Sequence, residues 1–336
     1  MRLRSCFHLH PDALCALPIA ILCLTERCGS RCVSCDYGRF GQDDMPMELA
    51  CRLARELARL GTRYILVTGG EPLLHPQWAE IAGVLRSCGM RIGMATNGLL
   101  ISRHAEALAR CIDELYVSLD GATPESYQAI RGVAGLNLVE RGIRQVAGKL
   151  PVVIRTTVQR GNFEEIPALL RLARSWGATH HSFLAVDAHS TASFGRRGDF
   201  DRSMNLRAGD LDRLARVLDE TESEFDGEFA RGYIVESKSK MRLLHSHFAA
   251  VLGLQDPLPV RCNAPRFSAV LETDGRIKPC FFLPASGRFD GSSLPKALNT
   301  AAGKDLRRQQ RLGHRPECSR CVCPSFKSGL ELRRGL

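Results

Sequence analysis

Three cysteines within eight residues offer the clearest chemistry in this chain. Cys28, Cys32 and Cys35 lie in the segment Thr25-Glu-Arg-Cys-Gly-Ser-Arg-Cys-Val-Ser-Cys-Asp36. Cysteine thiolates hold iron-sulfur clusters, and a cluster of four irons with three protein ligands keeps one iron open for another molecule. No fourth ligand follows closely, so the spacing favours an open metal centre. The alternatives are a zinc site or three unrelated core thiols.

A second group of cysteines lies near the C-terminus. Cys262 and Cys280 flank a segment that carries Asp274-Gly275, a dipeptide that predicts the turn of a β-hairpin. Such a hairpin would bring the two thiols together. Three more cysteines complete the group, namely Cys318, Cys321 and Cys323. The group predicts a four-thiolate site, for which a zinc ribbon is the alternative.

The elements that must position these residues repeat one theme: an apolar run, a loop and an amphipathic helix. Strands are predicted at 19–24, 64–67, 91–95, 114–119, 152–158 and 180–185. Helices between them include 47–60, 77–88, 102–110 and 166–176. Six strand-helix units predict a parallel sheet that is closed or nearly closed into a barrel. In such a barrel the chemistry lies at the C-terminal ends of the strands, and the Cys28 loop follows the first of them.

Composition limits the classes of protein and partner. The 336 residues suffice for one large and one smaller domain, and a hydrophobic content of 44% is ordinary for a folded protein. The formal charge of +10 could indicate nucleic acid, but the basic residues are scattered along helix faces. A solvated basic surface is the better interpretation, so no nucleic-acid partner is expected.

Secretion and membrane insertion are not expected either. The apolar run from Ala13 to Leu24 contains Pro18, lacks a cleavage site of small residues and leads directly into the cysteine loop. No segment approaches the roughly 20 apolar residues that span a bilayer. We therefore expect a cytoplasmic protein with reduced thiols and no membrane contact.

The pattern Cys28-x3-Cys32-x2-Cys35 after a first barrel strand resembles the signature of the radical S-adenosylmethionine (radical SAM) superfamily. This resemblance implies a 4Fe-4S cluster whose open iron is chelated by the amino and carboxylate groups of SAM. Gly69-Gly70-Glu71-Pro72 resembles the family's element beside the methionine amino group. Glycines let the backbone approach a ligand closely, and Glu71 offers an acceptor for an ammonium.

Residues after later strands also match the family's SAM or substrate contacts. Thr96 and Asn97 follow the third strand, and Ser118 and Asp120 follow the fourth. Hydroxyl and amide groups suit sugar hydroxyls because they both donate and accept. The alternatives are a plain turn at Asn97 and a helix N-cap at Asp120. Arg155 resembles a basic residue that pairs with the SAM carboxylate, although a barrel salt bridge is the alternative.

The C-terminal segment resembles the auxiliary-cluster extensions called SPASM and twitch domains. The shorter twitch form matches better, because too few cysteines remain for a second auxiliary cluster. The resemblance implies one auxiliary 4Fe-4S cluster on Cys262, Cys280, Cys318 and Cys321, with Cys323 as a spare or alternative ligand. The expected fold is therefore α/β, a partial (β/α)6 TIM-like barrel with a small, cysteine-rich twitch/SPASM-like extension.

Four regions follow from this division. They are an N-terminal extension at 1–16, a radical SAM core barrel at 17–205, a connecting helical segment at 206–260 and an auxiliary-cluster domain at 261–336.

The resemblance also implies an activity. Family members cleave SAM to methionine and a 5′-deoxyadenosyl radical that abstracts a substrate hydrogen, and a fully ligated auxiliary cluster favours net oxidation, so we expect an oxidoreductase. The preferred substrate is a small polar metabolite such as an aminocyclitol or a sugar. A peptide or protein maturase and a non-catalytic iron-sulfur electron-transfer protein are the alternatives. An electron donor such as flavodoxin or ferredoxin is an implied partner, and no catalytic acid or base is assigned.

Overall fold

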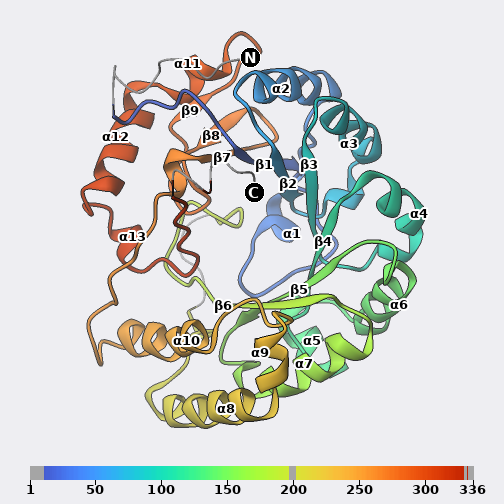
Figure 1. Ribbon diagram of the computed structural model, residues 1–336, viewed down its shortest axis with the longest axis vertical. Helices are drawn as coiled ribbons and strands as arrows, with labels where there is room; N and C mark the ends of the chain where they lie inside the picture. Colours follow the sequence, from blue (N-terminus) through green and yellow to red (C-terminus); the bar gives the residue numbers. More distant parts are fainter. Residues whose placement is uncertain (1–10, 197–201, 329–330, 332–336) are drawn as a thin grey trace.

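Six parallel strands and the helices outside them form an open barrel in the computed structural model, which describes residues 11–196, 202–328 and 331 (Figure 1). The strands are β1 (Ile19–Thr25), β2 (Tyr64–Gly69), β3 (Arg91–Thr96), β4 (Glu114–Ser118), β5 (Val152–Val158) and β6 (His180–Ala185). Each pairs in parallel with the next along the chain. The predicted partial (β/α)6 barrel is confirmed, because the sheet does not close on itself.

The outer helices lie along the convex side of this sheet in Figure 1. They are α2 (Met47–Arg59), α3 (Trp78–Ser87), α4 (Ile101–Cys111), α5 (Pro124–Arg131), α6 (Leu136–Val146) and α7 (Ile166–Ser175). Helix α2 shows why they pack there: it buries Ala50, Leu53, Ala54 and Leu57, which share one face at helical spacing. On the strand side, Ile65 and Val67 of β2 are buried. They alternate with more exposed residues, which point to the opposite face of the sheet.

Short helices occupy several of the loops. They are α1 (Tyr37–Phe40), η1 (Pro72–Leu74), η2 (Phe163–Glu165), η3 (Ala208–Asp210) and η4 (Ala264–Arg266). Helix α1 directly follows the cysteine loop, and η1 begins at the last residue of the predicted Gly-Gly-Glu-Pro element.

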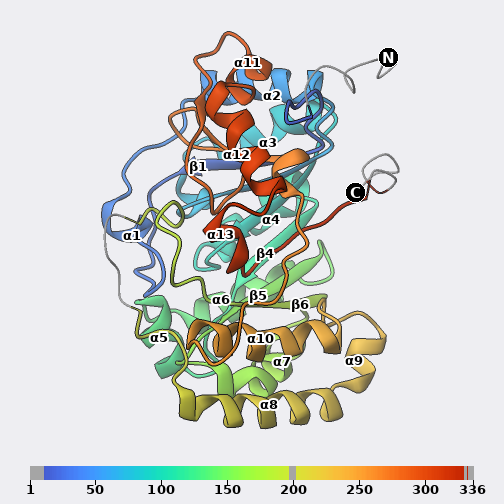
Figure 2. The same ribbon diagram turned by 90° about the vertical axis from the view of Figure 1, so that its left-hand side faces the viewer.

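A second hydrophobic core lies beside β6. It is formed with α8 (Leu211–Glu224), α9 (Asp226–Ala230) and α10 (Lys238–Val251), all within the predicted connecting segment. Helices α8 and α10 lie side by side (Figure 2). The chain after α9 pairs with the outer edge of β6, where the amide of His181 donates to the carbonyl of Tyr233 at 2.7 Å. This pairing covers backbone groups that an edge strand would otherwise expose.

The C-terminal extension continues the barrel sheet. Its elements are β7 (Ser268–Leu271), β8 (Arg276–Lys278), β9 (Gly287–Arg288), α11 (Leu294–Leu298), α12 (Ala301–Arg311) and α13 (Pro316–Ser319). Strands β7 and β8 form the predicted antiparallel hairpin around Asp274-Gly275. Strand β7 also pairs in parallel with β1, so the sheet order is β6-β5-β4-β3-β2-β1-β7-β8-β9. The sheet therefore crosses the boundary predicted at residue 261.

The last two expectations from the sequence concern the N-terminal extension and membrane-spanning helices. The first ten residues of the predicted N-terminal extension lie outside the described residues. Among the described helices, none is both long and apolar enough to cross a membrane.

Candidate active site

The loop that carries Cys28, Cys32 and Cys35 leaves the C-terminal end of β1 and docks on α5. The amide of Arg31 donates to the carbonyl of Arg131 at 3.1 Å, and the amide of Val33 donates to that of Ile130 at 3.0 Å. These bonds also satisfy carbonyls at the C-terminal end of α5, which lack partners within the helix. The loop backbone is thus held from a neighbouring strand-helix unit.

The three thiols are half-buried and none forms a disulfide. The Cys28 sulfur accepts weak hydrogen bonds from the Ser30 amide at 3.4 Å and the Asn97 side-chain amide at 3.7 Å. Burial raises the pKa of all three thiols, that of Cys35 to about 12. A metal that binds here must displace the thiol protons, as cysteine-ligated metals do. Three clustered thiols with amide donors to sulfur fit the donor set of an iron-sulfur cluster.

Arg131 is a charged neighbour of this loop that sequence reasoning missed. Its side chain is only 12% exposed and pairs with Asp120 at 3.0 Å. Burial raises the pKa of Cys32, and the positive charge of Arg131 acts in the opposite direction. Asp120 also accepts from the Thr157 amide at 2.7 Å, so it joins α5 to β5. The N-cap of α5 is Thr123, which removes the N-cap alternative for Asp120.

The Gly69-Gly70 pair lets the loop after β2 lie directly against the start of the cysteine loop. The amide of Gly70 donates to the carbonyl of Thr25 at 2.7 Å, and the next amide donates to the carbonyl of Arg27 at 2.8 Å. A β-carbon on Gly69 would collide with the Thr25 carbonyl, and one on Gly70 with the Arg27 carbonyl. Both positions therefore need glycine for contact within the chain, whatever ligand they also approach.

Glu71 joins the loops after β2 and β3. Its carboxylate accepts from the Leu73 amide at 3.1 Å, the Thr96 hydroxyl at 2.9 and 3.0 Å, and the Asn97 amide at 2.7 Å. Burial raises the pKa of Glu71, whereas these donors favour the ionised carboxylate. Through these bonds Glu71 holds the loops after β2 and β3 together. Its predicted contact with the SAM ammonium stays a prediction.

The remaining predicted cofactor residues separate into two places. Pro72 begins η1, while Thr96 and Asn97 lie beside Glu71 and so close to Cys28. Ser118 ends β4 and is directly opposite Arg155 of β5. The Arg155 guanidinium points toward the second cysteine group, because its Nη2 lies 3.7 Å from the sulfur of Cys323. Arg155 thus touches the second cysteine group.

The second cysteine group converges on one pocket. Cys262, Cys280, Cys318, Cys321 and Cys323 all line it, together with side chains such as Phe282 and Gln310. Burial raises the pKa of Cys280 to about 12 and that of Cys318 to about 11, and it also raises the pKa of Cys321. Cys323 is exposed, unlike the other four. The pocket therefore offers one thiol more than a 4Fe-4S cluster requires.

Neither group has the geometry of a compact single-ion site. In the part of the chain that the structure describes, no three His, Cys, Asp or Glu side chains converge to hold one metal ion.

A segment after β6, residues 187–196, contacts both cysteine groups. Phe194 has a positive φ of 59°, which is uncommon for a residue with a side chain. Its carbonyl accepts from the Asp36 amide at 2.8 Å, beside Cys35, and its ring meets that of Phe281, beside Cys280, at 5.1 Å. One strained residue therefore contacts the neighbours of a cysteine from each group.

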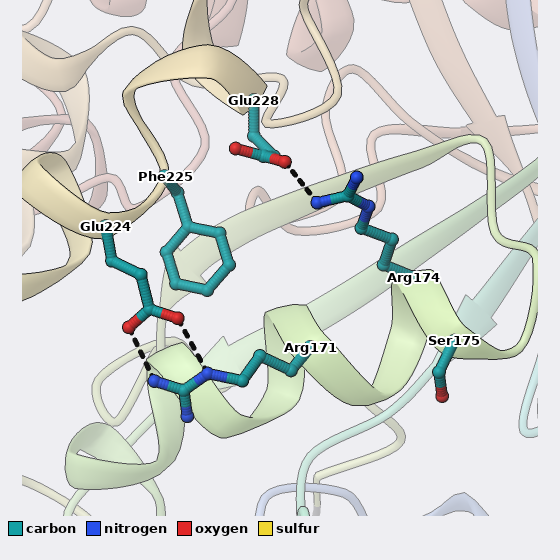
Figure 3. Close-up of a pocket in the computed structure, with 6 residues that line it drawn as sticks. All are labelled: Arg171, Arg174, Ser175, Glu224, Phe225 and Glu228. Carbon is teal, nitrogen blue, oxygen red and sulfur yellow. Dashed lines mark hydrogen bonds and ion pairs between the residues drawn. The ribbon is translucent and has the colours of Figure 1, made fainter.

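A hollow of about 450 Å³ lies away from both cysteine groups. Figure 3 shows that its charged side chains face one another, with Arg171 bound to Glu224 and Arg174 bound to Glu228. It contains no cysteine. We assign it no chemistry, because its charges are already paired.

Comparison with known proteins identifies relatives of this chain. The family model described as the radical SAM superfamily matches residues 22–173. The chain is 30% identical over 340 residues to the mycofactocin maturase MftC of Mycobacterium tuberculosis, which covers 92% of this chain and 79% of MftC. It is 29% identical over 211 residues to an AdoMet-dependent heme synthase of Methanosarcina barkeri, which covers 60% and 57% of the two chains. The chain spans only about half the length of the first curated relatives it matches.

A solved structure shares the fold. The structure of anSMEcpe with bound AdoMet aligns with a TM-score of 0.66 over 91% of this chain and 85% of that one. Only 16% of the aligned residues are identical.

Proposed function

Since the chain belongs to the radical SAM superfamily, whose members are enzymes that bind a 4Fe-4S cluster and SAM, we propose that Cys28, Cys32 and Cys35 ligate this cluster. When bound, the cluster and SAM supply a radical able to remove hydrogen from an unactivated carbon. The observation that carries the assignment is the meeting of three loops at Cys28. The loop after β3 contacts its sulfur through Asn97, and Glu71 fixes that loop to the one after β2.

The chain's own residues then bind and orient SAM. Gly69 and Gly70 keep the backbone free of side chains beside the cysteine loop. Thr96, Asn97 and Ser118 present hydroxyl and amide groups at strand ends, where sugar hydroxyls need both donors and acceptors. Glu71 and Asp120 are buried acceptors: Glu71 fixes the backbone amide of Asn97, and Asp120 fixes that of Thr157. Protein groups of this kind orient a cofactor whose own chemistry performs the reaction.

We propose that the second cysteine group ligates an auxiliary 4Fe-4S cluster through Cys262, Cys280, Cys318 and Cys321. All four are half-buried in one pocket, as a fully protein-ligated cluster requires. Cys323 is the exposed fifth thiol and lies against Arg155. Complete protein ligation leaves no iron open for substrate, so this cluster serves as an electron acceptor. Net oxidation of the substrate is the reaction we propose.

The proposed substrate is a small polar metabolite, such as an aminocyclitol or a sugar. Polar residues on adjacent strands support this proposal, namely Ser118 at the end of β4 and Thr157 of β5. A peptide is the second candidate. The likeness to a mycofactocin maturase over 92% of this chain favours it.

Cleavage of SAM without substrate tests the core of the proposal. We expect 5′-deoxyadenosine to accumulate when anaerobically reconstituted protein receives SAM and dithionite, because its formation needs only the first cysteine group and the SAM-binding loops. Chromatography with mass detection measures the product. Omission of dithionite is the control, and assembly of both clusters without any 5′-deoxyadenosine would favour an electron-transfer protein. Deuterium transfer into 5′-deoxyadenosine from labelled aminocyclitols or labelled peptides then separates the substrate classes.

The ligand set of the auxiliary cluster makes a separate prediction. Cys323→Ala is expected to retain about eight irons per reconstituted chain, because four other thiols complete the cluster. Cys321→Ala, the matched variant two residues away, is expected to lose about four. Iron and sulfide analysis measures both. Loss of iron in the Cys323 variant alone would make Cys323 a ligand in place of Cys321.

A further inference from the structure

Residues 187–196, which we call the bridge segment, contact the surroundings of both cysteine groups. On one side the segment meets residues 34–37, which include Cys35. On the other side it meets residues 278–282, which include Cys280. A change in the position of one group can therefore reach the other through a single short segment.

Arg196 fixes the bridge segment to the first cysteine loop. Its side chain is only 1% exposed, and its Nη2 donates to the carbonyl of Ser34 at 3.1 Å. Its Nη1 donates to the carbonyl of Ser190 at 2.7 Å, and the guanidinium lies 4.8 Å from the centroid of the Phe194 ring. A buried charge whose partners are removed is strongly destabilising, so this arrangement resists displacement. The backbone directly before Cys35 is thus held by a buried cation.

Phe194 contacts both sides of the bridge at once. Its carbonyl accepts hydrogen bonds from the Asp36 amide at 2.8 Å and from the Cys35 sulfur at 3.5 Å. Its ring centroid lies 5.1 Å from that of Phe281 and 6.1 Å from that of Phe282, both in edge-to-face geometry. Aromatic rings in this geometry attract one another beyond the burial of their surfaces. A shift of the Phe281 and Phe282 rings would therefore move the carbonyl that Cys35 contacts.

Two hydrogen bonds hold the bridge segment to the chain around Cys280. Lys278 of β8 donates through its Nζ to the carbonyl of Ala192 at 2.5 Å. The Ser190 hydroxyl donates to the carbonyl of Phe282 at 3.4 Å. Phe282 also lines the pocket of the second cysteine group. Residues on both sides of Cys280 thus contact the bridge segment.

We infer that the bridge segment makes SAM binding at the first cysteine group depend on the loading of the second. The inference rests on the proposed function, which assigns a cluster to each group. Because metal binding orders the chain around its ligands, a cluster held through Cys280 would fix residues 281–282, whose rings and carbonyl hold the bridge segment. Without that cluster the tether would loosen, and Phe194 and Arg196 would no longer fix the backbone around Cys35. Both are positioning residues, which act on SAM binding through the first cysteine loop.

Removal of the second cluster tests this coupling. Cys321→Ala removes a proposed ligand of that cluster at a residue outside 278–282, so the bridge segment keeps all its contacting side chains. With about four irons retained per chain, we expect its dissociation constant for SAM to be at least about fivefold higher than that of the parent protein. Equilibrium dialysis of SAM against both anaerobically reconstituted proteins, without a reductant, measures binding in the absence of cleavage.

Phe194→Ala removes the ring that meets Phe281 and Phe282 but keeps every proposed cluster ligand. It should retain about eight irons per chain and bind SAM as weakly as Cys321→Ala does. The double variant should bind no more weakly than either single variant, because both substitutions interrupt the same route. Phe229→Ala is the matched control, since its partly buried ring packs against the core beside β6, and it should bind SAM within about twofold of the parent.

Amide hydrogen exchange gives a second measurement that needs no variant at Phe194. Residues 34–37 should exchange faster in Cys321→Ala than in the parent, because their backbone is held less firmly. Equal exchange, or SAM binding as tight as in the parent, would overturn the coupling and leave the proposed function intact. Additive losses of affinity in the double variant would overturn it as well. A parent protein that holds two clusters but binds no SAM would instead contradict the proposed function itself.

Discussion

Simultaneous replacement of Cys28, Cys32 and Cys35 by alanine is expected to abolish detectable SAM cleavage and to lower the iron content from about eight to about four atoms per chain. Thiolates are the only protein ligands proposed for the first cluster, so no side chain remains to hold its irons. The second group lies in its own pocket and should stay loaded. Iron analysis and 5′-deoxyadenosine assays on the anaerobically reconstituted protein measure both effects.

A matched triple variant controls for the loss of three thiols. Cys51→Ala/Cys88→Ala/Cys111→Ala removes half-buried cysteines that lie in or directly after the outer helices α2, α3 and α4. It should keep about eight irons and normal cleavage, since neither proposed cluster uses these residues. Loss of all iron from the Cys28 triple variant would contradict two independent sites. Retention of all iron would remove the first site altogether.

Replacement of Glu71 by glutamine is expected to weaken both the fold and SAM cleavage. The amide group would present a donor where the Leu73 amide, the Thr96 hydroxyl and the Asn97 amide now donate to a carboxylate. A buried amide left without an acceptor costs about 1–3 kcal/mol, and we expect the free energy of unfolding to fall by that amount. Because Asn97 contacts the Cys28 sulfur, its displacement should lower the cleavage rate roughly 10- to 100-fold.

Two measurements check this prediction. Denaturant unfolding gives the stability change, and the initial rate of 5′-deoxyadenosine formation gives the catalytic change. Glu80→Gln makes the same substitution at an exposed position of α3 and should affect neither. If Glu71→Gln were as stable as the parent, the hydrogen bonds by which Glu71 joins the loops after β2 and β3 would not explain a lower cleavage rate. A change in cleavage alone would then point to direct contact with SAM.

The barrel was predictable because its strands are short apolar runs with a clear rhythm. The predicted runs at 152–158 and 180–185 coincide with β5 and β6, and the others differ by one or two residues. Helices were placed from the spacing of their buried faces, as in α2. Between β4 and β5 the strand-helix rhythm implies one helix, whereas the structure has two, α5 and α6, and the Thr123 cap and Pro124 mark where the first of them begins.

The parts of the site that escaped prediction depend on contacts distant in the chain. Arg131 gives no signal of its own, because an arginine at the end of an amphipathic helix usually faces solvent, whereas here it is buried against Asp120. Phe194 lies in a segment of small and charged residues that reads as a linker. The orientation of Arg155 toward Cys323 likewise depends on how the extension folds back. Motif spacing located the cysteines but could not locate these partners.

The parallel pairing of β7 with β1 has a consequence for the order in which the protein forms on the ribosome. Ile19 emerges early, but its partner Ser268 is made only after the six barrel strands and helices α8 to α10 have been synthesised. Until then one side of β1, the strand that leads into Cys28, keeps its backbone groups unpaired. Pairing across such a sequence separation is slow and leaves edges open to association with other chains. Completion of the strand that carries the first cysteine loop thus waits for the segment that carries the second cysteine group.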